Sequence, residues 1–148
     1  MSTTIEQHGE TRTPGYEVIE NLTETPVKYF STSTPPMQDV GDAAVYYDEI
    51  FDAEGKVVGH TVGYAIVHER RESDGHLVVS YDETLRIEGG TLHATGTFDR
   101  NVLLDGGKGR LQLVGTSGRF LGRAGIREWW LTAPLPNETV ALRMMLCG

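Results

Sequence analysis

The segment at positions 115–134, GTSGRFLGRAGIREWWLTAP, places an arginine and two tryptophans close together in one predicted strand. Alternate residues of a strand share a face, so Arg127, Trp129 and Leu131 lie on one side and Trp130 on the other. If the first face points inward, it combines a cation with an aromatic wall. Such a face could line a small-molecule site, although ordinary core is the more frequent role of an inward aromatic side chain such as Trp129.

An inward Arg127 needs a carboxylate partner, because an unpaired buried charge costs several kcal/mol. Glu24 is the favoured partner, and Glu17 and Glu20 are alternatives in the same predicted strand. The pair would close one end of a barrel. It could be a purely structural plug or part of the chemistry.

The stretch HLVVSYDETLRIEGG carries a second candidate, Tyr81. Its alternation places an apolar series on one face, with Glu83 as a polar exception: Leu77, Val79, Tyr81, Leu85 and Ile87. A phenol on an apolar face needs a hydrogen-bond partner. Either a backbone acceptor or a bound ligand could supply it.

Other chemistries have little support in the sequence. The five histidines lack metal-binding spacing, and Ser117 in GTSGRF is not in a nucleophile elbow. The glycines around it are not followed by a predicted helix that could bind phosphate. Cys147 is the single cysteine, which excludes an intrachain disulfide and a cysteine-rich zinc site. We therefore expect neither a metal nor a cofactor.

The charge and the chain ends limit the partners and the location. A net charge of -8 and a pI near 5.0, without a basic cluster, argue against nucleic acid. The sequence has neither a secretory signal nor the ~20 apolar residues of a membrane span. We expect a cytoplasmic protein with a disordered arm at residues 1–15 and one domain at residues 16–148.

Short alternating segments separated by turns recur along the chain and predict an all-β protein. The expected strands are residues 16–30, 43–51, 57–69, 77–87, 91–98, 110–114, 126–133 and 140–146. Eight sequential antiparallel strands favour a closed up-and-down barrel, whose interior can hold one small ligand. A β-sandwich is the competing architecture.

One connection, YFSTSTPPMQDVGD, is too long for a tight hairpin. It could be an ordinary surface loop. It could also be a lid over the barrel mouth, stiffened by Pro35 and Pro36, with Phe30 and Met37 as its apolar underside.

Three motifs together, EIFDAEGKVVGHTVG, GGTLHATGTF and GTSGRFLGRAGIREWW, resemble the allene-oxide-cyclase-like barrels. Among these, the chain is most similar to the spirotetronate and spirotetramate cyclases. The resemblance implies an eight-stranded barrel, usually homodimeric. It also implies a cofactor-independent Diels–Alder cyclisation, in which a linear polyketide's exocyclic alkene adds across a conjugated diene.

The resemblance also implies roles for particular residues. Tyr81 and Trp129 would be catalytic, Glu24 and Arg127 would form the barrel-end salt bridge, and residues 29–39 would cap the pocket. Independently of the resemblance, Trp130 faces outward by alternation, and an exposed tryptophan suggests a dimer contact. The substrate-binding residues would be Phe30, Met37, Tyr46, Ile66, Leu111 and Leu131.

Two other functions remain open at this point. A lipocalin-like carrier would bind a hydrophobic molecule unchanged, and another cyclase of the same barrel family would act on an epoxide or an oxygenated chain.

Overall fold

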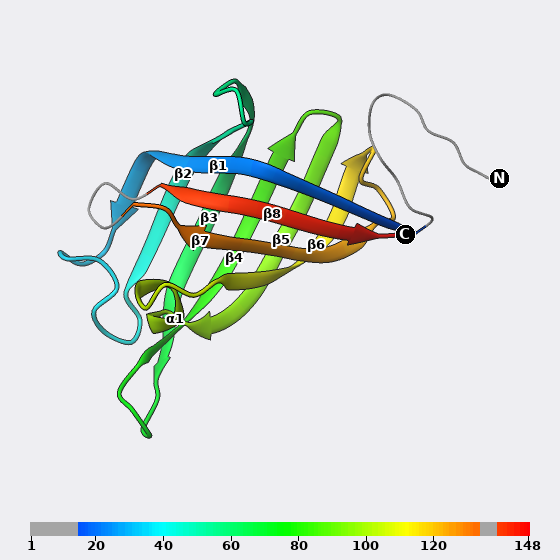
Figure 1. Cartoon of the computed structure of the whole chain (residues 1–148). Coiled ribbons are helices and arrows are strands. Elements are labelled where there is room, and N and C mark those ends of the chain that lie inside the picture. Colours follow the sequence, from blue (N-terminus) through cyan, green and yellow to red (C-terminus); the bar gives the residue numbers. More distant parts are fainter. Residues whose placement is uncertain (1–14, 134–138) are drawn as a thin grey trace.

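The computed structural model describes residues 15–133 and 139–148, which form one closed antiparallel barrel with a short helix (Figure 1). Nearly all of the expected arm, residues 1–14, lies outside the described part. The elements are β1 (Tyr16–Ser31), β2 (Ala43–Phe51), β3 (Val57–Arg70), β4 (Leu77–Ile87), β5 (Gly90–Asp99), α1 (Asn101–Leu104), β6 (Gly109–Gly118), β7 (Ala124–Leu131) and β8 (Val140–Cys147).

The strand order confirms the up-and-down barrel. Each strand pairs with the next in sequence, and β1 pairs with β8, for example at Thr23 and Ala141. This last pairing closes the sheet on itself, so the alternative of two stacked sheets is wrong.

Most predicted strand limits hold within two residues, but β6 is longer than expected and α1 was not expected. The glycines and hydroxyl residues after Val114 do not look like a strand. They nevertheless pair with the start of β5, where Thr91 faces Ser117 beyond a register shift. The helix α1 is too short to show a helical period.

The barrel interior has two parts. The lower half, toward the β2–β3 and β4–β5 hairpins, is a solid apolar core. Its buried side chains include Leu85, Leu92, Leu113, Phe120, Leu142, Met144 and Leu146. A second, smaller cluster lies toward the other end: Met37, Ala44, Ala65, Val67 and Val79. The cavity described below lies in this upper half.

The connection at residues 32–42 is held in place over the upper end, which is the end that Figure 1 draws at the lower left, with α1 and the β3–β4 hairpin. Asp42 accepts hydrogen bonds from the backbone N–H groups of Gln38 and Asp39, at 2.9 and 2.8 Å. Arg70 on β3 donates to the Gln38 carbonyl and the Asp39 carboxylate, both at 3.0 Å. The connection is therefore an ordered cap.

Within residues 15–133 and 139–148, no helix is long and apolar enough to cross a membrane.

Candidate active site

A cavity of about 550 Å³ opens at the upper end of the barrel. This volume is in the range of small-molecule sites. The capping connection, α1 and six strands contribute its lining residues: Glu24, Pro26, Tyr29, Pro35, Pro36, Met37, Ala44, Tyr46, Asp48, Ala65, Tyr81, Glu83, Arg100, Leu103, Leu104, Arg127, Trp129, Leu131 and Val140.

A cluster of three aromatic side chains forms one wall of the cavity. The rings of Tyr81 and Phe98 stack with centroids 5.1 Å apart, and Trp129 packs edge-on against both. Arg127 lies over the Trp129 ring, with Cζ 4.8 Å from its centroid. These contacts fix the orientation of each ring, so the wall is rigid before a ligand arrives.

The Tyr81 hydroxyl makes no hydrogen bond to any side chain or backbone group within the described ranges, although Tyr81 lines the cavity. Burial raises the pKa of Tyr81, and the nearby Arg100 partly opposes this effect. The hydroxyl is therefore neutral at pH 7 and keeps a proton to donate. Of the two expectations for Tyr81, this geometry favours a ligand as the partner.

Arg127 forms the floor of the cavity with two carboxylates. Its Nε donates to Glu83 Oε1 at 2.8 Å, and its Nη2 donates to Glu24 Oε1 at 2.7 Å. Tyr46 donates a short hydrogen bond to Glu83 Oε2. Burial lowers the pKa of Arg127, but Glu24 and Glu83 outweigh burial and raise it. The predicted partner Glu24 is thus paired with Arg127, and Glu83 is a second partner.

The expectation that this pair closes an end of the barrel is wrong. Glu24 lies in the middle of β1, and the apolar core continues beneath Arg127. The lower end is instead closed by Glu17, which binds Arg123 and Arg119. Simple alternation would put Glu17 and Glu24 on opposite faces of β1. A register shift between Ile19 and Leu22 turns both glutamates inward, which spacing alone does not reveal.

Asp48 extends the charged floor and was not predicted from the sequence. It follows Tyr46 on the inward face of β2 and lines the cavity. Its pKa is raised to about 8, first by burial and then by the neighbouring Glu24 carboxylate. The two-residue alternation of a strand could have predicted the inward position of this aspartate in AAVYYDEIF. The residues that share its face are Ala44, Tyr46, Asp48 and Ile50.

Two of the predicted substrate contacts lie on the outer face of the barrel. Phe30 is 65% exposed on the outer face of β1, and the adjacent Tyr29 lines the cavity in its place. Ile66 is also on the outer face, because Ala65 and Val67 take the inward positions of β3. Each prediction was one residue out of phase.

Leu111 does face inward, but it lies in the core and not on the cavity surface. The other predicted contacts, Met37, Tyr46 and Leu131, line the cavity. Gly63 lies opposite Tyr46 on β3, and a Cβ there would collide with the tyrosine ring. The glycine therefore makes room for Tyr46 to reach Glu83.

The outer face of β7 is partly covered. Glu128 accepts hydrogen bonds from Arg110 and Arg143, both at 2.6 Å. Burial raises the pKa of Glu128, but these two arginines lower it by more. Trp130 is half-buried beside them, with Lys108 Nζ 4.7 Å from its ring centroid. Trp130 points outward, as predicted.

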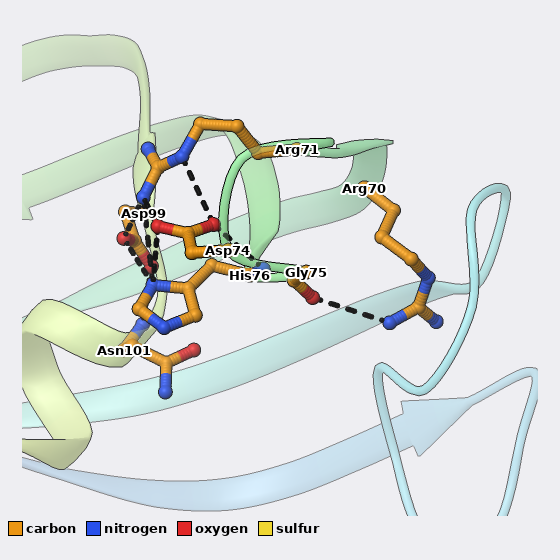
Figure 2. A network of polar contacts seen from close by, with 7 residues as sticks. All are labelled: Arg70, Arg71, Asp74, Gly75, His76, Asp99 and Asn101. Atoms are coloured by element: carbon orange, nitrogen blue, oxygen red, sulfur yellow. Dashed lines mark hydrogen bonds and ion pairs between the residues drawn. The ribbon is translucent and has the colours of Figure 1, made fainter.

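A second polar network ties the β3–β4 hairpin to the start of α1 (Figure 2). His76 Nδ1 lies 2.8 Å from Asp99 Oδ2, and Arg71 Nη2 donates to the same oxygen at 2.7 Å. Asp99 also accepts from the Asn101 backbone N–H at 2.8 Å. The hydrogen bond to Asp99 raises the pKa of His76. The network thus holds the helix that lines one side of the cavity mouth.

Asp74, His76 and Asp99 have ligand atoms within 4.8 Å of one another, the spacing of a metal site. The expectation of no metal site did not consider this group, because folding brings together residues that no short motif joins. Arg71 binds both carboxylates and supplies a positive charge there. We therefore interpret the group as a structural ion-pair network.

Solved structures with the same barrel include AbnU, an exo-specific intermolecular Diels–Alderase, with a TM-score of 0.81 and 28% identity over 90% of this chain and 97% of that one. The Diels–Alderase AbmU from Streptomyces koyangensis has a TM-score of 0.78 and 29% identity over 88% of this chain and 63% of its own.

A nonspecific heme-binding cyclase, which catalyses [4+2] cycloaddition during neoabyssomicin biosynthesis, has a TM-score of 0.79. Its identity is 29% over 93% of this chain and 65% of that one. The present chain therefore spans slightly less than two thirds of the length of two of these structures. The comparison with curated proteins found no match.

The sequence also matches a family model over residues 23–146, from the strand that carries Glu24 to the end of the last strand. The matched range includes every residue of the aromatic wall and the charged floor. The chain belongs to the family of allene oxide cyclase barrel-like domains.

Proposed function

We propose that this protein is a cyclase that catalyses a [4+2] cycloaddition in antibiotic biosynthesis. The observation that carries the proposal is the cavity of about 550 Å³, with its rigid aromatic wall and a tyrosyl hydroxyl that has no protein partner in the described part of the chain. The Diels–Alderases AbnU and AbmU support it, since they share the barrel at 28% and 29% identity.

The reaction suits a pocket of this kind. A conjugated diene and an alkene form two carbon–carbon σ bonds, and three π bonds become one. No proton, electron pair or leaving group is exchanged with the protein. The barrier lies largely in folding a flexible chain until the reacting carbons touch, and orientation can lower such a barrier by about 7–11 kcal/mol at best. Packing against Trp129 and Leu131 would supply that orientation.

Tyr81 would add an electronic contribution. Its hydroxyl would donate a hydrogen bond to a carbonyl conjugated with the alkene, withdrawing electron density and fixing which face reacts. One such bond contributes about 1–2 kcal/mol. Tyr81 is therefore an accelerating group and not the source of most of the catalysis.

For the substrate, we propose a linear polyketide whose tetronate or tetramate ring bears an exocyclic alkene, with a conjugated diene further along the chain. The product is a spiro-fused cyclohexene. The aromatic and other apolar side chains that line the cavity support a mostly hydrophobic substrate. No metal or cofactor has a step in this reaction.

The test is incubation of the protein with a linear tetronate triene, followed by chromatography and mass spectrometry. A new peak of unchanged mass with the spectrum of a cyclohexene is expected. An unchanged retention time with tight binding would indicate a carrier instead. A separate diene and alkene, and an epoxide of similar length, would show whether an intermolecular cycloaddition or another isomerisation is preferred.

We also propose that the protein is a cytoplasmic homodimer. The half-buried, outward Trp130 supports the dimer, since tryptophan is enriched in interfaces, and the single cysteine is compatible with a reducing compartment. Light scattering coupled to gel filtration would give the dimer mass. A monomer mass at micromolar concentration would contradict the dimer.

A further inference from the structure

The floor of the cavity holds more negative charge than the cation within it can balance. Glu24, Asp48 and Glu83, from three different strands, surround the guanidinium of Arg127 on a fourth strand. If all three acids were ionised, this buried layer would carry two uncompensated negative charges. Buried charges without partners are strongly unfavourable.

The hydrogen bonds show where a proton would relieve the excess charge. Glu83 is satisfied, since Oε1 accepts from Arg127 and Oε2 accepts from Tyr46. Glu24 Oε1 also accepts from Arg127. By contrast, Glu24 Oε2 and Asp48 Oδ1 are buried without a donor in the described part of the chain.

Asp48 and Glu24 both line the cavity from neighbouring strands, where Asp48 is paired with Pro26, two residues from Glu24. Two carboxylates have only acceptors, so a hydrogen bond between them requires a proton on one of them. Thr61 faces Asp48 across the β2–β3 pair, but its hydroxyl makes no hydrogen bond to a described residue. A proton held between the two acids is therefore the way to satisfy both.

The strand registers place this acid pair deeper in the cavity than Tyr81. Asp48 is opposite Thr61 on β3, whereas Tyr81 is opposite Ala65, four residues nearer the mouth. A substrate whose carbonyl end is bound at Tyr81 must therefore send its opposite end toward Asp48.

We propose that Asp48 is a neutral carboxylic acid that donates its proton to Glu24 and uses its carbonyl oxygen to bind a hydroxyl group at the leading, diene end of the substrate. The inferred ligand chemistry is thus an alcohol at the end remote from the carbonyl group. This inference rests on the proposed function for the identity of the substrate, but not for the presence of the proton.

The pKa of Asp48, raised to about 8 by burial and by Glu24, agrees with this arrangement. The groups that face Asp48 are Glu24 from β1, Tyr46 from β2, Glu83 from β4 and Arg127 from β7. Because the acid binds its proton more tightly in the folded protein, its contribution to stability is complete below about pH 3.8. That contribution is lost as the pH rises toward about 8.

Asp48→Asn and Asp48→Leu form a matched pair of variants for the test. The amide of asparagine still donates to Glu24 and still offers a carbonyl oxygen, but it cannot titrate. Leucine offers neither. Two unreactive probes, saturated analogues of the tetronate triene with a terminal hydroxyl or a terminal methyl ether, report binding by calorimetry without any reaction.

We expect the wild type and Asp48→Asn to bind the hydroxyl probe roughly tenfold more tightly than the methyl ether, the effect of about one hydrogen bond. Asp48→Leu should lose this preference. Infrared difference spectra should show a protonated carboxyl band in the wild type at pH 7 that disappears above about pH 8. That band should be absent from Asp48→Asn at pH 7.

Equal affinities of the two probes for the wild type would overturn the hydroxyl contact, and absence of the carboxyl band at pH 7 would overturn the shared proton. If Asp48→Leu does not fold, the two probes and the asparagine variant still decide the outcome. Failure of the wild type to convert the triene, with the hydroxyl preference intact, would refute the cycloaddition but not this site. Conversion of the triene without a preference for the hydroxyl probe would refute this site but not the cycloaddition.

Discussion

The Trp129 ring meets the Tyr81 ring edge-on, with centroids 5.6 Å apart and planes inclined by 72°. Arg127, on the same strand, lies over the indole. The Trp129 side chain therefore contacts both Tyr81, the proposed hydrogen-bond donor, and Arg127 in the charged floor. The position of Trp129 therefore determines the shape of the cavity as well as part of its surface.

Trp129→Ala should lower turnover roughly a hundredfold, because a cavity with a missing wall no longer holds diene and alkene in contact. The barrel should stay folded, although loss of a buried indole costs about 3–5 kcal/mol of stability. Trp129→Phe is the matched control, and single-turnover conversion is the measurement. Wild-type conversion by the alanine variant would reduce Trp129 to ordinary core.

Tyr81→Phe should keep substrate affinity and lose about tenfold in rate, as expected for one hydrogen bond made in the transition state. The stacked contact with Phe98 does not need the hydroxyl, so stability should change little. Separate measurement of affinity and single-turnover rate tests this split. Lower affinity with an unchanged single-turnover rate at saturation would mean that Tyr81 only binds the substrate.

Arg127→Met should destabilise the protein by about 3–5 kcal/mol, because it leaves Glu24 and Glu83 buried without their cation. Adding Glu24→Gln and Glu83→Gln removes the stranded charges and should recover much of the loss. Urea unfolding of the single and triple variants gives the comparison. If Arg127→Met unfolds at the wild-type midpoint, the floor is not a desolvated ion-pair network.

Replacement of residues 34–38 by a Gly/Ser linker should lower turnover beyond any loss of affinity. The replacement removes Pro35, Pro36 and Met37 from the cavity lining, and with them part of the surface that excludes water and compacts the substrate. Arg70→Ala is a milder variant that loosens the cap without changing its sequence. Unchanged single-turnover conversion after linker replacement would return this segment to a simple surface connection.

The His76 network should make stability depend on pH. The pKa of His76 is raised by Asp99, so its stabilising contribution is full below about pH 6.5 and is lost as the pH rises through the raised value. The pKa of Asp74 is lowered to about 2 by Arg71, so that contribution is lost only as the pH falls from about 4 toward 2. Thermal midpoints of wild type and His76→Asn should therefore converge at high pH. A constant difference from pH 6 to 9 would contradict the assignment.

The barrel was predictable because its signals are local. Period two and turn residues mark each strand, and the inward positions of Tyr81, Glu83 and Trp129 follow from alternation within a single strand. The predicted inward direction of the side chain was wrong for Phe30 and Ile66. A bulge near Val27 shifts the register of β1, and Ile66 lies in a strand whose two faces are both largely apolar.

The composition of the charged floor was less predictable, because it depends on registers between strands. Alternation could have placed Asp48 inward, but only the pairing of β1 with β2 brings it beside Glu24. The ion pairs of Glu17 at the lower end likewise depend on Arg119 and Arg123 in the turn between β6 and β7, more than a hundred residues away. No spacing within one segment encodes such contacts.

The apolar core beneath Arg127 sets a limit on substrate length. The floor lies partway along the barrel, and Leu85, Leu142 and other side chains fill the space below it. A longer substrate can therefore gain no depth and must extend through the mouth, past the cap and α1. Enlarging residues at the floor should shorten the accepted chain, whereas changes at Leu103 or Met37 should alter which chain ends are tolerated outside.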